Sequence, residues 1–427
     1  MKKDFRFIAI ATLLVATIIS MTLGGVENKV SQVKNYPATT CPGSLADSSV
    51  VDVMPNPKVL AASIPSKQGK MRPIGSRNFS TKKALLVDGG QITPVSVAKG
   101  SSGWLAAINC LVSDGDDWFV GGSANVTSKG VISVVNSGLS GAQVDFKVYS
   151  TKAPRTISKV IPANSEVDVM VDSLSPGEDS VAINAITRSG RVSIFMLDNQ
   201  KRGLRSMGAD FVASAPKPSN SLVIPNIPRV AKNKKTPQIL RVVVPGSVDA
   251  TLKATIYSSD GSFAPIGIDG ASVPGENVKD FAFLPIVADS SYSLKLEADV
   301  PISAAVLTIV GSDMVWATAT SEITNTGLQI GGFKPLIRLY GKTIDVDLNW
   351  IDVNGKHGNK RFVDKDTVAF RPKVGLARVI FTTRTSGIYG ALLIDNGSGA
   401  ALLPITSGSH LESSVLPQSD ARTINRG

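Results

Sequence analysis

Alternation between apolar and polar residues over short stretches is the feature that most constrains this chain. In the stretch "QVDFKVY", residues 143–149, every second residue is apolar or aromatic. A period of two is typical of a strand with one face buried and the other in solvent. Similar stretches recur between Gly, Pro, Asn and Asp residues, and after residue 26 none has the period of an amphipathic helix of three or more turns. The pattern predicts an all-β fold.

A weak internal repeat predicts how these strands are grouped. Its copies start at "GVISVVNSG", "ILRVVVPGS" and "KTIDVDLNW". Each copy has an alternating strand that ends near an aromatic residue (Tyr149, Tyr257 or Trp350), followed by further strands and a final hairpin. Units of about 80–100 residues with several such strands fit an antiparallel immunoglobulin-like sandwich. We therefore expect about three antiparallel immunoglobulin-like β-sandwich modules.

Pro-, Lys- and Ser-containing stretches set the expected boundaries of these modules. The first module is expected to carry additional strands at its N-terminal end. The predicted order is a signal anchor or transmembrane helix over 1–29, a stalk over 30–45, a first module over 46–213, a linker over 214–236, a second module over 237–325, a third module over 326–407 and a polar tail over 408–427.

The N-terminal segment predicts where the chain resides. Lys2, Lys3 and Arg6 precede a mostly apolar stretch of about 19 residues, long enough to cross a hydrocarbon core of about 30 Å. Flanking positive charges would keep the N-terminus in the cytoplasm. A cleaved signal peptide is the alternative, although its apolar region is usually shorter, about 7–15 residues. On either interpretation the bulk of the chain is extracytoplasmic, and we expect a single-pass protein of the cell membrane.

The net charge of +11 narrows the range of partners. The basic residues are scattered, their densest cluster outside the N-terminus is "RVAKNKKTPQILR", and aromatic residues make up only 6% of the chain. A nucleic-acid-binding protein more often has a basic stripe interleaved with aromatic residues, so no nucleic-acid partner is expected. Weak attraction to anionic envelope polymers or lipid headgroups explains the charge better.

Cys41 and Cys110 are the only two cysteines in the sequence. In an oxidising compartment two such cysteines usually form one disulfide. On the chain-entropy model, closing the loop between them would stabilise the fold by about 4 kcal/mol. Free, reactive thiols are the alternative interpretation.

The loop "CLVSDGDDWFVGG", which starts at Cys110, contains three acidic residues that raise the question of a metal site. Asp114, Asp116 and Asp117 lack the alternating oxygen ligands and distal Glu of a helix–loop–helix calcium site. A calcium ion held by two of these carboxylates and backbone carbonyls remains a weak option. The favoured interpretation is that Asp114 and Gly115 form a turn while Trp118 packs inward.

No other motif predicts catalysis or a cofactor. The two histidines, His357 in a hairpin-like sequence and His410 in the polar tail, lack the partners that a zinc site needs. Asp345 and Asp347 alternate along one strand, so they share a face; they could support glycoside hydrolysis but are more typical of a solvated sheet face. We therefore expect no enzyme activity, no cofactor and no metal site beyond the weak calcium option.

Several short motifs resemble a family of uncharacterised actinobacterial membrane-anchored secreted proteins that share a domain of unknown function. The matching elements are "TTCPGSLAD", "WLAAINCLVSDGDDWFVGG", "GVISVVNSG" and "EADVPISAAV". They place Cys41, Cys110, Trp118, Gly121, Gly122 and Asn136 on the family's pattern, with structural roles. The resemblance implies a single-pass, extracytoplasmic β-rich protein and supplies no activity or catalytic residue.

The sequence thus favours a non-enzymatic, membrane-anchored envelope protein that scaffolds or binds a cell-wall polymer or an envelope protein. One alternative is an accessory subunit that positions an envelope glycosyltransferase or hydrolase. A divergent hydrolase that uses two carboxylates is a further alternative.

Overall fold

The computed structural model describes residues 38–45, 50–54, 60–66, 71–73, 79–87, 92–100, 102–203, 205–230 and 236–406. These residues belong to one compact unit, Tyr36–His410. The predicted anchor over 1–29 and the polar tail over 408–427 lie outside the described residues. Among the residues that are described, no helix is long and apolar enough to cross a membrane.

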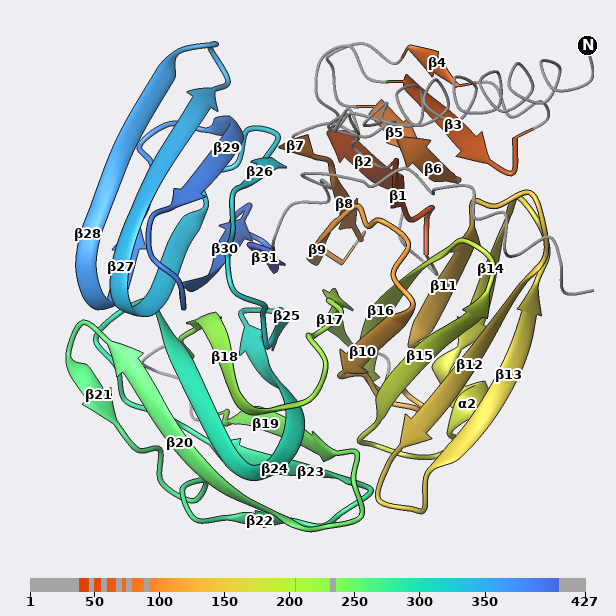
Figure 1. The fold of residues 1–427 in the computed structure, drawn as a ribbon, viewed down its shortest axis with the longest axis horizontal. Helices are drawn as coiled ribbons and strands as arrows, with labels where there is room; N and C mark the ends of the chain where they lie inside the picture. The colour runs from red at the N-terminus through yellow and green to blue at the C-terminus, as the bar shows by residue number, and fades with distance from the viewer. Residues whose placement is uncertain are drawn as a thin grey trace, which may run out of the picture. The chain divides into compact units, whose positions relative to one another are not determined.

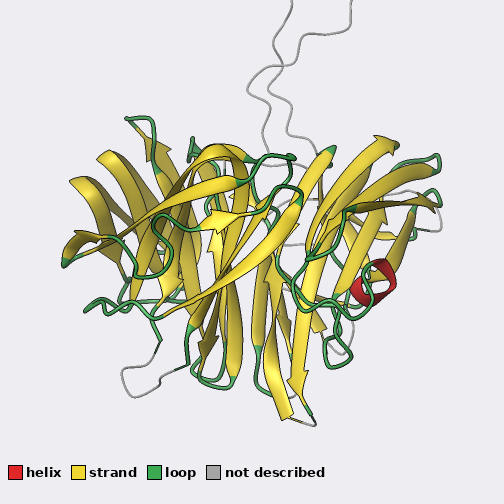
Figure 2. Ribbon diagram, turned by 90° about the horizontal axis from the view of Figure 1, so that it is seen from below, coloured by secondary structure: helices red, strands yellow, loops and turns green. Residues whose placement is uncertain are grey.

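β-strands make up nearly all of the regular structure (Figure 2). Within the described ranges α2, Val171–Leu174, is the only helix. The strands pair into sheets arranged in sandwich-like layers, and nearly all strand pairs are antiparallel. The prediction of an all-β fold is confirmed.

The strands fall into four successive groups, here called repeats. The first repeat contains β1 (Thr39–Cys41), β2 (Val50–Met54), β3 (Leu60–Ile64), β4 (Arg72–Pro73), β5 (Phe79–Thr81), β6 (Ala84–Val87), β7 (Ile92–Thr93), β8 (Val95–Lys99) and β9 (Leu105–Asn109). The second contains β10 (Asp116–Val120), β11 (Val131–Asn136), β12 (Ala142–Tyr149), β13 (Arg155–Ile161), β14 (Ser165–Met170), β15 (Ala182–Ser189), β16 (Val192–Arg202) and β17 (Arg205–Val212).

The third and fourth repeats follow in the same way. The third contains β18 (Ser219–Pro228), β19 (Gln238–Val244), β20 (Ala250–Ser258), β21 (Gly261–Phe263), β22 (Ser272–Val273), β23 (Asn277–Phe283), β24 (Ser291–Val310) and β25 (Asp313–Thr318). The fourth contains β26 (Thr326–Gln329), β27 (Leu336–Asp352), β28 (His357–Phe370), β29 (Leu376–Thr383), β30 (Tyr389–Asp395) and β31 (Ala400–Pro404).

Each repeat ends in a hairpin whose last strand lies at a common centre (Figure 1). These last strands are β9, β17, β25 and β31; β9 and β25 each pack against both β17 and β31. Every residue of β9, β25 and β31 is buried. A strand covered on both faces reads as a continuous apolar run rather than an alternating one, which explains sequences such as "LAAIN" and "AALLP".

Outer strands keep the alternation that the sequence suggested. In β12 and β20 buried residues alternate with more exposed ones along most of the strand. These strands have one face on a sandwich core and the other toward solvent. The second repeat divides its strands between two separate sheets, and so does the first repeat apart from β7, which joins a sheet of the fourth repeat.

The last two repeats use one long strand in both layers instead. β24 pairs with β20 over Ser293–Ala298 and with β19 over Ser303–Leu307. β27 similarly pairs with β30 near its start and with β29 near its end. A strand that changes sheets in this way joins the two layers covalently.

Buried and half-buried polar side chains connect consecutive repeats. Glu166 of β14 accepts hydrogen bonds from the backbone N–H groups of Gly43 and Ala84 in the first repeat. Arg241 of β19 donates to the carbonyl oxygens of Gly122 and Val181 in the second repeat. Each contact joins a side chain of one repeat to backbone groups of another.

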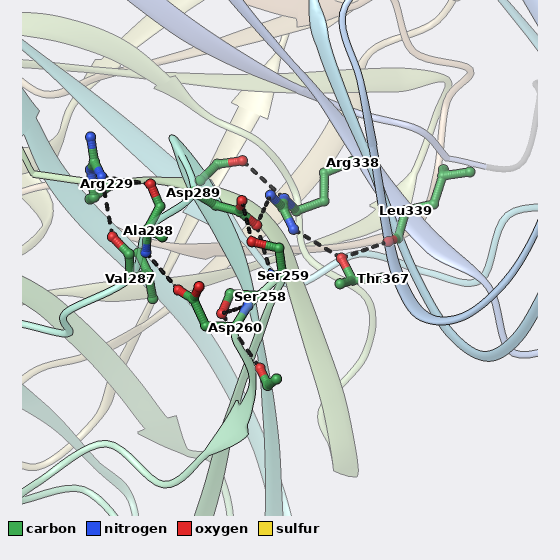
Figure 3. Close-up of polar contacts among 12 residues, drawn as sticks. Arg229, Ser258, Ser259, Asp260, Val287, Ala288, Asp289, Arg338, Leu339 and Thr367 are labelled. Atoms are coloured by element: carbon green, nitrogen blue, oxygen red, sulfur yellow. Dashed lines mark hydrogen bonds and ion pairs between the residues drawn. The ribbon is translucent and has the colours of Figure 1, made fainter.

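Arg338 of β27 connects the fourth repeat to the third in the same manner (Figure 3). Its guanidinium is 1% exposed, lies 2.8 Å from a carboxylate oxygen of Asp289, and donates to Ser291 Oγ and Thr367 Oγ1. The Asp289 carboxylate also accepts from Ser259, so the pair is held from both sides. A buried ion pair of this kind needs such additional hydrogen bonds to offset the cost of desolvation.

The fourth repeat also contacts the first. β26 pairs with β7 in parallel, with Gly327 opposite Ile92. The Asn109 side-chain amide donates to the carbonyl oxygen of Pro404 at 2.9 Å. The beginning and the end of the described fold are thereby joined.

One feature differs from the predicted organisation. Residues 39–41, assigned to the stalk, form the buried strand β1 paired with β6, so the stalk prediction is wrong for them. The segment predicted as a first module with additional N-terminal strands, 46–213, contains strands of both the first and the second repeat, and its bounds as a module stay a prediction. The first repeat is built from strands of two to five residues. Whether any of these parts folds as an independent domain stays a prediction.

Candidate functional site

The disulfide predicted between Cys41 and Cys110 is confirmed. Cys41 ends β1 and Cys110 follows β9, and both side chains are buried. Thr40 and Leu111 exchange backbone hydrogen bonds beside the disulfide. The bond therefore fastens the first described strand to the innermost strand of the same repeat, which is a structural role.

The three acidic residues after Cys110 have different partners. Asp114 accepts a hydrogen bond from the N–H of Gly115, as expected for a turn. Asp116 accepts from the Asn184 amide and lies 3.2 Å from the Lys217 ammonium. In the described ranges no group of three or more His, Cys, Asp or Glu side chains is arranged to hold a metal ion. A calcium ion held by two of these carboxylates stays a prediction.

Asp117 is the unusual member of this group because its side chain is buried. Burial raises the pKa of Asp117 to about 7; the Ser214 hydroxyl lowers it, and nearby Asp114 and Asp116 raise it further. A carboxyl group with such a pKa changes its charge near neutral pH. It is therefore a proton-sensitive point of the second repeat.

Trp118, Gly121 and Gly122 are packing residues. Trp118 is buried and stacks on Tyr149, with ring centroids 5.8 Å apart. A Cβ on Gly121 would lie 2.9 Å from Val212, and Gly122 has a φ of +82° that disfavours other residues. The structural roles implied by the resemblance fit these positions.

Asp313 links all four repeats at the centre. Its carboxylate accepts hydrogen bonds from the N–H groups of Leu105 in β9, Ala400 in β31 and its neighbour Met314, at 2.8–3.0 Å. Burial raises the pKa of Asp313 to about 6, while N–H groups including that of Ala209 in β17 lower it. One carboxylate thus contacts strands from every repeat.

Two further buried carboxyl groups surround Trp316 of β25. Asp210 accepts from the Trp316 backbone N–H and Asp198 from the indole N–H, both at 2.9 Å. Burial raises the pKa of both groups. The Arg241 guanidinium lies 5.3 Å from the centroid of the Trp316 ring. The three central aspartates therefore hold strands together, and their contacts are with the protein itself.

The outer face of the sheet formed by β27, β28 and β29 has the features of a ligand-binding surface. We define this outer face by the side of β27 that carries Asp345, Asp347, Asn349 and Ile351. Asp345 forms a two-pronged contact with Arg361, and Asp347 lies 2.6 Å from Arg384. The Arg361 guanidinium lowers the pKa of Asp345. The predicted shared face is observed, and each acid is paired with an arginine.

A pocket of about 310 Å³ lies beyond these ion pairs on the same three strands. Cross-strand pairing places Asn349 between Asn359 and Ile380, and Ile351 between His357 and Arg378. Cross-strand partners point to the same face of a sheet. Two rows of side chains, one rich in amides and one with imidazole and guanidinium groups, therefore line the pocket.

Trp350 and Gly358 lie between these rows and also line the pocket. A Cβ on Gly358 would lie 2.3 Å from the Trp350 indole, so glycine gives the ring room. Trp350 packs on Phe370, which packs on Phe362, at centroid distances of 5.9 and 5.6 Å. This aromatic cluster fixes the strands that carry the polar rows.

Sequence reasoning found only part of this arrangement. His357 is exposed next to the turn between β27 and β28, as its hairpin-like sequence predicts, and it also lines the pocket; His410 lies outside the described residues. The buried charges had a local signal, because each interrupts an apolar run, as in "QILRVVV" for Arg241 and "LIRLYG" for Arg338. The pocket had no such signal, because its residues come from three strands.

Family comparison identifies the chain more firmly than its motifs do. The model of a family of unknown function, DUF5719, matches residues 87–364. The chain belongs to the DUF5719 family. The matched DUF5719 region runs from the end of β6 into β28 and includes Asp198, Asp210 and Asp313. No curated protein matches the chain.

Membership in DUF5719 agrees with the predicted domain of unknown function. The actinobacterial source, the membrane anchor and the Cys and Trp-x-x-Gly-Gly pattern of that prediction stay predictions. In this DUF5719 chain the pocket is formed partly by the matched region, through Asn349 and Asn359, and partly by β29, through Arg378 and Ile380.

Proposed function

We propose that this DUF5719 protein is a non-enzymatic envelope protein that binds an anionic cell-wall polymer on the outer face. In this proposal an N-terminal transmembrane helix over 1–29 anchors the chain, and immunoglobulin-like sandwiches hold the binding face outside the cytoplasm. The observation that carries the proposal is the pocket of about 310 Å³ between the two rows of polar side chains.

The chemistry of the lining favours an anionic, hydroxylated ligand. Asn349 and Asn359 offer both donors and acceptors for hydroxyl groups. Arg378 and His357 supply donors suited to a phosphate or carboxylate group. No carboxylate is among the lining residues, and the net charge of +11 would attract a polyanion over a longer range.

Affinity electrophoresis tests this proposal directly. Purified full-length protein is run through gels that contain polygalacturonate, an anionic glycan, or dextran, a neutral one. We expect polygalacturonate alone to retard the protein, with a retardation that weakens at high salt because charge contributes to binding. Equal mobility in the two gels would contradict the proposal.

Variants then locate the binding face. Asn349→Ala with Asn359→Ala should weaken retardation, because both amides line the pocket. Val363→Ala is the matched control, since Val363 is exposed on the same strand as Asn359 but does not line the pocket. Equal losses in the variant and the control would place the binding elsewhere.

A protein partner is the second candidate, as expected of an accessory subunit for an envelope glycosyltransferase or hydrolase. It is favoured by β28, a 14-residue strand that pairs only with β27 among the described strands. An open edge can accept a strand from another chain. Crosslinking through a photoreactive residue at position 363 should capture one dominant envelope protein if this role is the main one.

A further inference from the structure

A second pocket lies at one end of the sandwich of the second repeat. Its volume is about 270 Å³, and it forms where β12 ends, β13 begins and the chain leaves α2. Its lining includes Val148, Lys152, Arg155, Ser175 and Glu178. The described residues that line it are all different from those of the pocket on the outer face, so the two sites are separate.

Arg155 projects from the core-facing side of its sheet. It is the cross-strand partner of Val148, and Val148 is buried in the sandwich core. Because cross-strand partners point to the same face of a sheet, Arg155 lies on that side too, at the open end of the sandwich. The residue is exposed, and its guanidinium has no partner among the described residues. A ligand in the pocket can therefore reach this group.

Glu178 is the only carboxylate among the described lining residues, and both of its oxygens already have partners. One oxygen lies 2.5 Å from the Lys152 ammonium, and the other accepts a hydrogen bond from the Thr151 hydroxyl. The hydrogen bond from Lys152 lowers the pKa of Glu178, so the carboxylate stays ionised. It offsets one of the two positive charges of the lining and leaves that of Arg155 without a counterion in the described part of the chain.

The groups that a ligand can reach are donors rather than acceptors. A guanidinium has five N–H donors in a planar fork, and the Lys152 ammonium, on a side chain that is 73% exposed, keeps two donors besides the one facing Glu178. The fork can bind two phosphate oxygens at once, and the ammonium can take a third, which a carboxylate does not have. The pocket equals roughly nine waters of about 30 Å³ each, so a phosphate with a small organic group fits.

We infer that this pocket binds the phosphate group of a small phosphate monoester through Arg155 and Lys152. The site does not depend on the polymer proposed for the outer face, because it is formed by other strands.

Phosphorus-31 NMR on the purified full-length protein tests the inference. The probe is glycerol 3-phosphate at pH 8, where a phosphate monoester carries close to two negative charges. We expect saturable line broadening with a dissociation constant on the order of 1 mM, as is usual for a small ligand with few contacts. Inorganic phosphate should displace the probe, whereas glycerol and acetate should not.

Three variants locate the site. Arg155→Gln should lower the affinity for glycerol 3-phosphate about tenfold, and Arg155→Lys, which keeps the charge but loses the fork, should lower it less. Arg188→Gln is the matched control, because it removes the same charge from the same repeat outside the pocket, where Arg188 pairs with Asp145. It should leave the affinity unchanged.

This test separates the inference from the proposed function. Asn349→Ala with Asn359→Ala should leave phosphate binding unchanged, and Arg155→Gln should change retardation by polygalacturonate no more than Arg188→Gln does. Absence of saturable broadening, displacement by acetate as effective as by phosphate, or equal losses of affinity in Arg155→Gln and Arg188→Gln would overturn the inference. Arg155 would then be only a charge that protects an edge strand.

Discussion

Aspartate residues have opposite roles at the centre of the fold and on its outer face. Asp313 is fully buried and accepts hydrogen bonds from strands of other repeats, whereas Asp347 is partly exposed and pairs with a single arginine. In the centre no water can replace a lost acceptor, while on the outer face it can. An aspartate therefore holds strands of different repeats together in the centre, whereas on the outer face it is a surface charge that water can replace.

Removing the central carboxylate should have the largest effect. Asp313→Ala leaves the N–H groups of Leu105 and Ala400 buried without acceptors, each at a cost of about 1–3 kcal/mol. We expect the free energy of unfolding to fall by about 3–5 kcal/mol in urea titrations. Asp313→Asn keeps one acceptor oxygen and should lose less; equal losses in the two variants would show that the hydrogen bonds are not the cause.

Breaking the ion pair between the third and fourth repeats comes next. Arg338→Met leaves Asp289 without its buried partner and should lower the free energy of unfolding by about 2–4 kcal/mol. Arg371→Met removes the same kind of group from an exposed pair with Asp395 and should cost less than about 1 kcal/mol. Similar decreases in melting temperature for the two variants would contradict the prediction that the buried arginine contributes more to stability than the exposed one.

Buried Asp117 should make the stability of the protein depend on pH, which an exposed aspartate would do far less. Its folded pKa of about 7 lies above the ordinary value of 3.8, so the folded state binds more protons between these values. Stability should therefore fall as pH rises from about 4 to 7, by on the order of 2–4 kcal/mol. Asp117→Asn removes this dependence, which urea unfolding of both proteins at pH 5 and pH 8 would measure. A wild-type minus variant difference that is constant with pH would refute the assignment.

The smallest effect is expected on the outer face. Asp347→Ala removes a partly exposed ion pair and should change the free energy of unfolding by less than about 1 kcal/mol, with the change shrinking as salt is added. Thermal melts at low and high salt measure it. A loss comparable to that of Asp313→Ala would mean that the outer face is part of the structural framework.

Alternation of apolar and polar residues predicted strands correctly wherever one face of the strand is exposed to solvent. Alternation in β12 and β20 predicted strands that the structure contains, and the shared face of Asp345 and Asp347 followed from the same period. Grouping of the strands was harder, because the short strands of the first repeat carry too little pattern to align with the others.

The candidate site on the outer face could not be predicted from the sequence, for a different reason. Asn349, Asn359 and Arg378 come together only through the register of three strands. Composition and spacing along the chain do not encode such neighbours.

The sequence by itself determined the all-β class, because a period of two allows no other way to bury the apolar residues. It also limited any disulfide within the chain to Cys41 and Cys110, because these are the only cysteines in the sequence, and the structure contains that bond. Only the tertiary structure decided that four innermost strands meet at Asp313 and that a pocket forms where β27, β28 and β29 lie side by side. Those features depend on long-range packing, in which each strand takes its partners from other parts of the chain rather than from its own pattern.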